Sequence, residues 1–335
     1  MTINLAIIGA GVMGADHARI FANEVPGVKL AAIVDADVAR ARKVADEYGA
    51  SHVTADPLEV INSRAVAAVV VAAPDKFHSA LTLACIAAGK PVLCEKPLSQ
   101  DVGECLSVMS AEEKRGKRLV QVGFMRRFDP AYAEMKALLA GGAIGKALVF
   151  HCQHRNVSAA YDARPETAIA NSAPHEFDVA RWLLETEFTA VSVFRPGGAA
   201  APATVPVQMV LETAGGALVN LEVNINAAYG YDVRGELVGE KGSIELRNPD
   251  VTSRNAALAR STAYPADWRP RFAEAYRRQN IAWVKSLEQG KPSHGASAWD
   301  GTCSTLTAEA GVKALQSGAR VEIALPAKPG FYATA

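Results

Sequence analysis

The feature that most constrains the fold is an apolar run near the start of the chain that ends in spaced glycines. The segment "LAIIGAGVMGADHARIF" places Gly9, Gly11 and Gly14 in a GxGxxG spacing. The run before the glycines has the length of a strand, and the segment after them has a helical pattern. Gly9 permits a tight turn, Gly11 lets the backbone approach a pyrophosphate, and Gly14 lets the helix pack on the strand. The spacing alone is weak evidence, but in this context it predicts a strand–turn–helix unit that binds a dinucleotide.

The second apolar run, "VKLAAIVDA", adds a carboxylate to this unit. It ends at Asp35, about twenty residues past the last glycine, where a dinucleotide-binding unit carries its ribose-binding acid. A carboxylate there accepts hydrogen bonds from both ribose hydroxyls and repels a 2′-phosphate, which favours NAD over NADP. Asp37 is a competitor that fits the end of the strand less well. The alternative interpretation is a structural glycine turn with an aspartate that caps a helix.

The alternation of segments predicts two domains of different kinds. Over roughly the first 120 residues, short apolar runs alternate with Ala-rich amphipathic segments, which predicts an α/β fold with a doubly wound parallel sheet. Later, "VPVQMVLETAGGALVNLEVNIN" and "YDVRGELVGEKGSIELRN" each have the pattern of two strands joined by a turn. Strands grouped in this way predict an α+β domain on a largely antiparallel sheet. We expect the first domain at 1–123 and the second at 124–335.

Composition narrows the range of partners. Lys plus Arg equals Asp plus Glu, at 35 each, so the formal net charge is zero. No basic field favours binding to nucleic acid or to a membrane surface. The cysteines are odd in number and scattered without a CxxC pair, which favours reduced thiols in a cytoplasm over disulfides or structural zinc. These cysteines are Cys85, Cys94, Cys105, Cys152 and Cys303.

A second group of polar residues follows a later strand. "PVLCEKP" is an apolar run that ends in Glu95 and Lys96. Ligands of open α/β sheets lie beyond the carboxyl ends of the strands, so both side chains are expected beside a nicotinamide. A lysine there can stabilise the alkoxide that develops as a hydride leaves. A solvated charge pair at a strand end is the plain alternative.

At this point the sequence resembles a known family. The segments "GAGVMG", "AAPDKFHS" and "GKPVLCEKPLS" resemble those of the Gfo/Idh/MocA oxidoreductases, and "CEKP" after "GKPVL" is the most specific of them. The later segments "GFMRRFDPAYAEMK", "HCQHRN", "HEFDVARWLL", "YGYDV" and "AWDGT" resemble bacterial inositol 2-dehydrogenases. The resemblance implies a Rossmann domain, a second domain with a large open sheet, and homotetramers built through that sheet. It also implies NAD-linked oxidation of a cyclitol or pyranose hydroxyl to a ketone, with myo-inositol as the first candidate.

The resemblance also assigns roles to residues of this chain. His175 corresponds to the general base, and Lys96 to the lysine of the family's motif. The cofactor contacts fall on Gly9, Gly11, Val12, Met13, Gly14, Asp35, Pro74, His78, Glu95 and Lys96. The polyol contacts of the family fall on Met125, Arg126, His154, Asp178 and Tyr231. To these we add Asn156, whose side chain can hydrogen-bond a hydroxyl, and Asn171, which we expect to act in catalysis or in substrate binding.

Strand alternation supports part of this assignment. In "HCQHRN", His154 and Asn156 point to one side of the strand, and His151 points to the other. Only one of these sets can face a cleft, and guided by the resemblance we choose His154 and Asn156. The histidines do not form a zinc pattern, so no metal is expected. A lone helical histidine such as His175 is more often a packed or surface residue, and Asp178 and the arginines at 126 and 127 could be ordinary surface charges.

The segment "NSAPHEFD" departs from the family at one position. Asn171 stands four residues before His175, where the family usually has an aspartate that orients the histidine and stabilises its charged form. Asparagine can donate and accept hydrogen bonds but carries no charge. The residue could contact a polyol in an active enzyme, or mark an impaired variant, or give way to Asp162 or Glu166 as the partner of His175. Ser172 could cap the helix, which would leave Asn171 just outside it.

Overall fold

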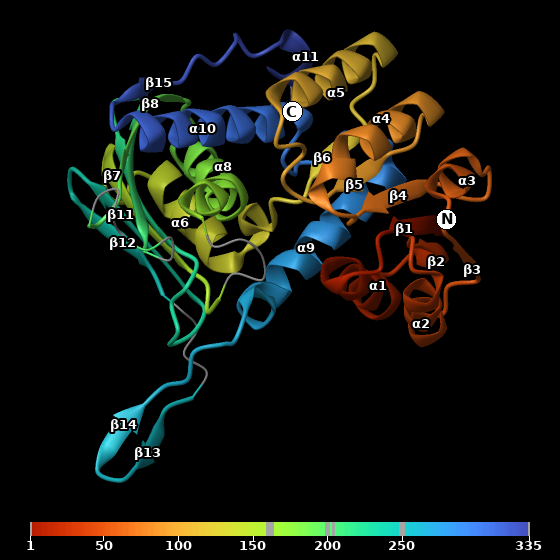
Figure 1. Cartoon of the computed structure of the whole chain (residues 1–335), viewed down its shortest axis with the longest axis horizontal. Coiled ribbons are helices and arrows are strands. Elements are labelled where there is room, and N and C mark those ends of the chain that lie inside the picture. Colours follow the sequence, from red (N-terminus) through yellow and green to blue (C-terminus); the bar gives the residue numbers. More distant parts are fainter. Residues whose placement is uncertain (1, 159–163, 198–201, 203–204, 248–251, 334–335) are drawn as a thin grey trace. The chain divides into compact units, whose positions relative to one another are not determined.

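The structure is a computed structural model that describes every residue except 1, 159–163, 198–201, 203–204, 248–251 and 334–335 (Figure 1). The chain forms two compact units, and each is described by itself. The first unit comprises Met1–Met125, Tyr276–Thr305 and Pro326–Ala335, and the second comprises Arg126–Ala275 and Leu306–Leu325. The expected division between residues 123 and 124 lies close to the first crossing between units. Two later segments that we assigned to the second domain group instead with the first unit.

A parallel sheet in the order β3-β2-β1-β4-β5-β6 forms the centre of the first unit. Its strands are β1 (Ile3–Ile8), β2 (Val28–Val34), β3 (His52–Thr54), β4 (Ala68–Val71), β5 (Val92–Cys94) and β6 (Val120–Val122). Its helices are α1 (Val12–Glu24), α2 (Val38–Tyr48), α3 (Pro57–Asn62), η1 (Asp75–Phe77), α4 (His78–Ala88) and α5 (Val102–Arg115). This strand order confirms the predicted doubly wound sheet, whose ligand site lies where β1 and β4 diverge.

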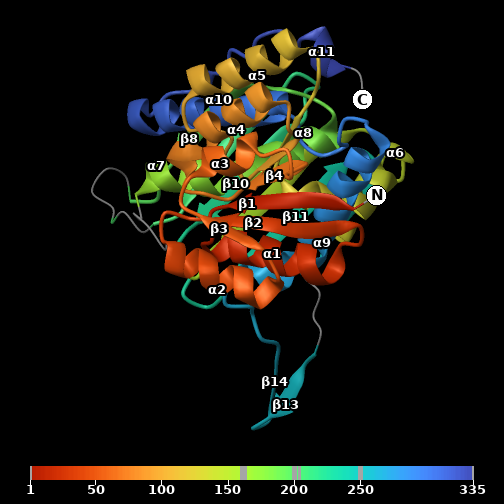
Figure 2. The ribbon, with the colours of Figure 1, turned by 90° about the vertical axis from the view of Figure 1, so that its right-hand side faces the viewer.

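The burial pattern explains why the sequence folds in this way. Every residue of β4 and β5 is buried, because helices cover both faces of a parallel sheet. Figure 2 shows α1 and α2 on one face of the sheet and α3 and α4 on the other. The sequence analysis missed β3, a short edge strand with no buried residue. An edge strand with so little apolar character carries no pattern that separates it from a loop.

The second unit is built on a mixed, mostly antiparallel sheet in the order β12-β11-β7-β10-β9-β8-β15, in which only β7 and β10 pair in parallel. Its strands are β7 (Ala147–Arg155), β8 (Phe188–Phe194), β9 (Val207–Thr213), β10 (Leu218–Asn224), β11 (Asp232–Gly239), β12 (Gly242–Leu246) and β15 (Val321–Glu322). The helices are η2 (Met125–Phe128), α6 (Pro130–Ala140), α7 (Pro165–Thr167), η3 (Ala168–Ser172) and α8 (Pro174–Leu184). Both predicted hairpins are present, as β9–β10 and β11–β12.

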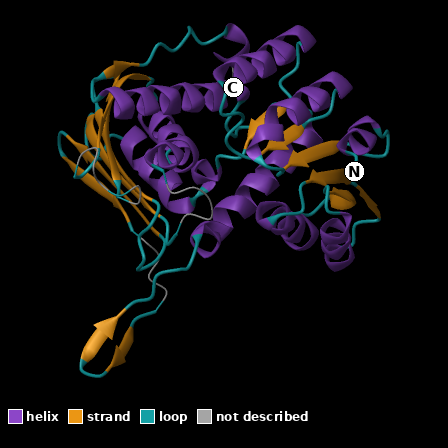
Figure 3. Cartoon of the chain, viewed as in Figure 1, coloured by secondary structure: helices purple, strands orange, loops and turns teal. Residues whose placement is uncertain are grey.

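The two faces of this second sheet differ. In Figure 3 the helices α6 and α8 lie on one face, and no described helix of the unit covers the other. Along β7, Cys152 and His154 are buried on the helix side, whereas His151 is exposed on the opposite side. The helix side is therefore where this unit can enclose a polar site. A separate two-stranded hairpin, β13 (Arg254–Ala256) and β14 (Ala259–Ser261), extends from the unit.

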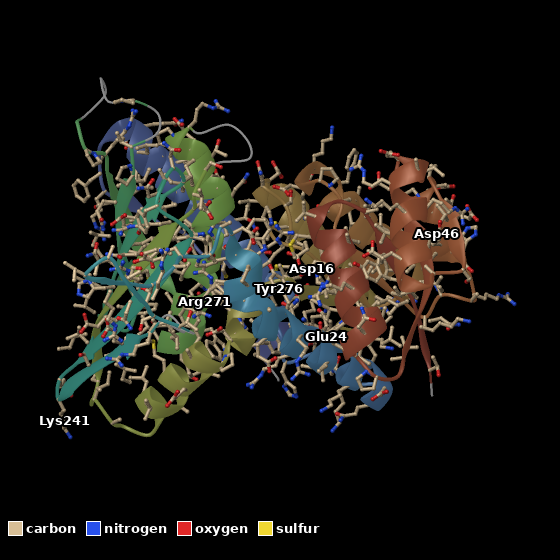
Figure 4. The ribbon with its side chains drawn as sticks, turned by 90° about the horizontal axis from the view of Figure 1, so that it is seen from below. Asp16, Glu24, Asp46, Lys241, Arg271 and Tyr276 are labelled. Atoms are coloured by element: carbon tan, nitrogen blue, oxygen red, sulfur yellow. The ribbon has the colours of Figure 1, made fainter. Side chains whose placement is uncertain are left out.

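The remaining helices are α9 (Trp268–Gln289), α10 (Ala298–Ser317) and α11 (Gly330–Ala333). The chain passes from one unit to the other within both α9 and α10. Figure 4 shows Arg271 and Tyr276 on α9, on either side of the first of these passages. Among the described residues, no helix combines the length and the apolar character that a bilayer span requires.

Candidate functional site

The glycine loop after β1 has the geometry of a phosphate-binding turn. Gly9 has a φ of +100°, and a Cβ on it would lie 2.4 Å from the carbonyl oxygen of Ala72, so only glycine fits there. A Cβ on Gly14 would lie 1.8 Å from the carbonyl oxygen of Gly9. At Gly11 a Cβ would meet no described atom within 4 Å. The backbone at Gly11 is therefore open to a pyrophosphate.

The start of α1 leaves backbone N–H groups for an anion. Gly11 precedes the helix, no described side chain caps it, and its first turn has no acidic residue. Val12 is exposed and Met13 is half-buried, so the first turn is not covered by the described residues. A helix N-terminus carries partial positive charge, and this loop therefore fits the pyrophosphate of a dinucleotide.

Asp35 lies directly against this loop. Its Oδ2 accepts a hydrogen bond from the Ala10 N–H at 2.8 Å, and its Oδ1 accepts one from the Asp37 N–H at 2.9 Å. Each oxygen keeps lone pairs that ribose hydroxyls can use. Asp37 instead caps α2, since its Oδ1 accepts a hydrogen bond from the Arg40 N–H at 3.1 Å. Of the two candidates, Asp35 therefore has the position of a ribose ligand.

Glu95 is held by a buried network that the sequence analysis missed. Its Oε1 lies 2.8 Å from Nε2 of His17, and Nδ1 of His17 lies 3.1 Å from Nδ2 of Asn280. All three residues are buried. The other oxygen of Glu95, Oε2, accepts a hydrogen bond from the Lys96 N–H at 3.2 Å. The network thus fixes the backbone that carries the lysine. Nothing in the sequence pattern links residues so far apart in the chain.

His78 is buried and bridges the segments that follow β4 and β5. Its Nδ1 lies 2.7 Å from the carbonyl oxygen of Pro97, and its Nε2 lies 2.8 Å from that of Ala73. A carbonyl oxygen only accepts hydrogen bonds, so both contacts form only when both ring nitrogens carry a proton. Burial by itself lowers the pKa of His78, but Cys94 and the two carbonyl groups raise it to about 10. The protonated ring thus links the two segments close to Pro74. Its described hydrogen bonds go to the protein backbone, and none of them indicates a contact with a cofactor.

The second unit encloses a cluster of charged and aromatic side chains. Arg126, His154 and Glu176 are all buried and meet there. Nη1 of Arg126 donates to Oε1 of Glu176, and Nδ1 of His154 lies 3.0 Å from Oε2 of the same carboxylate. The ring of Tyr231 meets that of His154 edge-on, with 6.0 Å between their centroids. Burial raises the pKa of Tyr231 to about 12.

The arginines at 126 and 127 are not surface charges. The Arg126 guanidinium stacks on Phe272 at 5.1 Å from the ring centroid. Arg127 binds Asp178 with two hydrogen bonds, from Nε to Oδ2 at 2.8 Å and from Nη2 to Oδ1 at 2.5 Å. Asp178 is 1% exposed. The alternative of ordinary surface charges at these positions is wrong, because the helix side of the sheet buries them in pairs.

Several of the predicted site residues of this unit lie near one another. His175 lies on α8, and its ring centroid is 6.3 Å from that of His154. Asn156 follows β7, and its Nδ2 donates to Oγ of Ser172 at 3.4 Å. The choice of His154 over His151 agrees with the burial of β7. Met125 is buried at the start of η2 and is the last residue of that segment of the first unit.

The backbone around Asn171 does not have the conformation that we expected, in which Ser172 caps the helix. Ser172 does not cap α8: the residue before Pro174 is Ala173, which is itself helical and makes no side-chain cap. The residues Ala168–Ser172 form a π-helical turn, closed by a hydrogen bond from the Ala173 N–H to the Ala168 carbonyl at 3.1 Å. Asn171 therefore lies inside a helical turn rather than outside it. Such turns occur often at functional sites.

Of the two other expected partners of His175, the structure describes one. Asp162 lies outside the described residues. Glu166 lies in α7, and its side chain makes no hydrogen bond or ion pair with the described residues. Within that part of the chain, no group of three or more His, Cys, Asp or Glu side chains could hold a metal ion.

Glu176 is the main residue of the cluster that sequence analysis missed. Residues Pro174–Arg181 of α8 are all buried, so the helix has no polar face turned to solvent. On a helix enclosed on all sides, spacing alone cannot show which polar residues point toward a shared site.

Comparison with known proteins identifies the family of both halves of the chain. Residues 3–124 match a family described as "Oxidoreductase family, NAD-binding Rossmann fold", and residues 132–245 match the GFO/IDH/MocA C-terminal domain. The chain is 48% identical to inositol 2-dehydrogenase 1 of Saccharopolyspora erythraea, with 100% of each chain covered. It is 40% identical to an inositol 2-dehydrogenase of Streptomyces avermitilis, with 98% of this chain and 97% of the relative covered.

A solved structure is similar over the whole chain as well. It is the myo-inositol dehydrogenase of Lactobacillus casei in complex with NAD(H) and myo-inositol. The TM-score is 0.93 at 29% identity, covering 99% of this chain and 100% of that one. The open glycine loop, Asp35 beside it and the two family matches lead to one conclusion: this chain belongs to the Gfo/Idh/MocA family and is an NAD-dependent oxidoreductase.

Proposed function

We propose that this enzyme oxidises a ring hydroxyl of a cyclitol, most directly myo-inositol to its 2-ketone, with NAD as the hydride acceptor. The observation that carries the proposal is the full-length similarity to proteins named inositol 2-dehydrogenase, at up to 48% identity. The buried cluster of polar side chains around Arg126 and His154 supports it. A polyol presents many hydroxyl groups, and their recognition needs many hydrogen-bonding side chains.

Oxidation of a hydroxyl group to a ketone removes one proton from the oxygen and one hydride from the carbon. His175 takes the proton of the reacting hydroxyl as general base. The ammonium of Lys96 stabilises the negative charge that develops on that oxygen. NAD, held by the glycine loop and Asp35, would supply the acceptor for the hydride of the same carbon. The hydroxyl carbon thereby becomes a ketone, and NADH and one proton are the other products.

The remaining residues would hold and orient the ring. Met125, Arg126, His154, Asn156, Asn171, Asp178 and Tyr231 are the proposed substrate contacts. Asp178 is already bound by Arg127 at 2.5 and 2.8 Å, which supports a role in fixing that arginine in addition to any contact with a hydroxyl. We further propose a homotetramer built through the open sheet face. All five cysteines are buried and free, which supports a cytoplasmic location.

Asn171 favours two alternatives to the main proposal, and the experiment described below distinguishes them. An amide in place of the usual acid could change the choice of substrate toward another inositol stereoisomer or a pyranose, in either reaction direction. It could also leave a protein that binds cofactor but turns over slowly. Under the main proposal, Asn171 positions the substrate or the histidine through hydrogen bonds alone.

The test is NADH formation across a panel of inositols and aldohexoses, with NAD and with NADP, for the protein and for Asn171→Asp. We expect turnover of myo-inositol with NAD by the unaltered protein. Turnover only after the aspartate is installed would mean that the chain is an impaired variant. Turnover of a different sugar alone would replace myo-inositol as the substrate, and silence from both proteins would overturn the proposed activity.

A further inference from the structure

We infer that Glu176 is a positioning residue that holds the proton of His154 on Nδ1, so that Nε2 of His154 accepts a hydrogen bond from a substrate hydroxyl. The inference rests on the proposed function for the identity of the substrate. The position of the proton on His154, in contrast, depends only on the residues of this cluster. It assigns to a buried carboxylate a role in substrate recognition without contact with the substrate.

Two neighbours compete for Nδ1 of His154. Oε2 of Glu176 lies 3.0 Å away and can only accept a hydrogen bond, whereas Nη2 of Arg126 lies 3.4 Å away and can only donate one. If Nδ1 accepted from Arg126, its lone pair would face a carboxylate oxygen at the shorter distance. The shorter, charge-assisted contact with Glu176 is the stronger one. The proton therefore lies on Nδ1, which donates to Glu176.

The carboxylate stays ionised in this setting. Burial alone raises the pKa of Glu176, but Arg126, and after it His154, lower it below its usual value. The same pair acts on the arginine: burial lowers the pKa of Arg126, and Glu176 raises it well above its usual range. A buried Arg126–Glu176 ion pair is thus a permanent feature, and Glu176 remains an acceptor over the range in which the enzyme would work.

The other ring nitrogen faces away from this ion pair. No described residue makes a hydrogen bond to Nε2 of His154, and the described residues do not bury this atom completely. The rings of His175 and Tyr231 neighbour the ring of His154, at 6.3 and 6.0 Å between centroids. With the proton fixed on Nδ1, Nε2 offers a lone pair. It therefore selects a group that donates, as a hydroxyl does and as a fluorine or an ether oxygen does not.

The first test needs neither substrate nor turnover. Nitrogen-15 NMR of the full-length enzyme with labelled histidine distinguishes the two neutral ring forms, and the spectrum of His154→Gln identifies the signals of His154. We expect His154 to carry its proton on Nδ1 at about pH 8 and to keep it there in Glu176→Asp, whose shorter carboxylate still only accepts. A proton on Nε2 in the unaltered enzyme would overturn the inference, whatever the activity of the protein.

The second test reverses the polarity of His154. In Glu176→Gln the amide oxygen can accept from Arg126 while the amide nitrogen donates to Nδ1 of His154, which moves the histidine proton to Nε2. The substrates are myo-inositol and analogues in which fluorine replaces one hydroxyl. In the unaltered enzyme, we expect kcat/KM for the analogue fluorinated at the position that contacts His154 to be at least about tenfold below that for myo-inositol. In Glu176→Gln we expect this difference to become smaller. The inductive effect of fluorine is the same in both enzymes and cancels in the comparison.

Two controls separate the possible failures. Glu176→Asp should keep the fluorine penalty of the unaltered enzyme, because its side chain is still an acceptor. An equal penalty in all three proteins at every ring position would contradict the role of Glu176 even if the enzyme is an active inositol dehydrogenase. If Glu176→Gln does not fold, the NMR result for the unaltered enzyme decides the inference.

Discussion

Lys96 carries the most specific functional prediction at the scale of a single residue. Replacing it with methionine keeps the length of the side chain and removes the charge that would stabilise an alkoxide. We expect Lys96→Met to lower kcat by roughly 10²–10³-fold, the effect of losing one such electrostatic contact. Lys117 is exposed and provides the matched control, since Lys117→Met should leave kcat unchanged. Steady-state NADH formation measures both variants, and a kcat for Lys96→Met within about threefold of normal would remove the lysine from the mechanism.

His78 gives the protein a pH dependence of known sign. Burial lowers its pKa, but Cys94 and the two carbonyl contacts raise it from 6.5 to about 10 on folding. A group whose pKa is raised in the folded state stabilises that state fully below its unfolded pKa, and this contribution disappears as the pH passes the folded pKa. The contribution of His78 should therefore be complete below about pH 6.5 and lost toward about pH 10.

Unfolding by urea measures this contribution. The free energy of unfolding of the protein should exceed that of His78→Gln by up to a few kcal/mol at about pH 6. The difference should shrink as the pH approaches about 10, while the titration of other groups cancels between the two proteins. A constant difference across this range would mean that the His78 ring is neutral when folded and makes only one of its two hydrogen bonds.

At the scale of elements, the loop between β1 and α1 separates folding from cofactor binding. A Cβ at position 14 would overlap the carbonyl oxygen of Gly9 at 1.8 Å, whereas a Cβ at position 11 would meet no described protein atom within 4 Å. Gly14→Ala should therefore displace α1 from β1 and lower the melting temperature by several degrees. Gly11→Ala should fold normally but weaken NADH binding at least about tenfold, because the added methyl group stands where a pyrophosphate must approach.

Calorimetry and titration of NADH fluorescence distinguish these two results. The pair is informative because both variants add the same methyl group to the same loop. Normal NADH affinity in Gly11→Ala would show that the pyrophosphate does not approach the backbone at that residue. An unchanged melting temperature in Gly14→Ala would show that the contact between α1 and β1 is loose enough to absorb the methyl group.

The elements also show which parts of the molecule a sequence can reveal. Buried parallel strands and glycine-containing hairpin turns have strong local patterns, so β1, β2, β4, β5, β6 and the hairpins β9–β10 and β11–β12 were predicted. The roles of His17, Asn280 and Glu176 were not, because each depends on partners far away in the chain or on a helix buried on every side. The π-helical turn at Ala168–Ser172 has no propensity signal and became visible only in the structure.

At the scale of the whole molecule, the open face of the second sheet is the surface that the proposed tetramer would use. Leu218, Val149 and Val238 form one row across β10, β7 and β11, because Leu218 pairs with Val149 and Val149 pairs with Val238. Leu218 is 42% exposed. No described helix of the unit covers this face. Exposure of such an apolar row to water is unfavourable, and burial against another surface would stabilise the protein.

We therefore expect Leu218→Arg to break the assembly. Placing a charge in a buried, isologous contact costs several kcal/mol at every copy of the interface, which is enough to dissociate an oligomer at micromolar concentration. Sedimentation velocity should show a four-chain species for the protein and a smaller one for the variant. Leu106 lies on α5 in the first unit and is 43% exposed, so Leu106→Arg is the matched control and should leave the mass unchanged. A single-chain mass for the unaltered protein would mean that the row stays in contact with water. This chain would then not form the tetramer that the family resemblance implies.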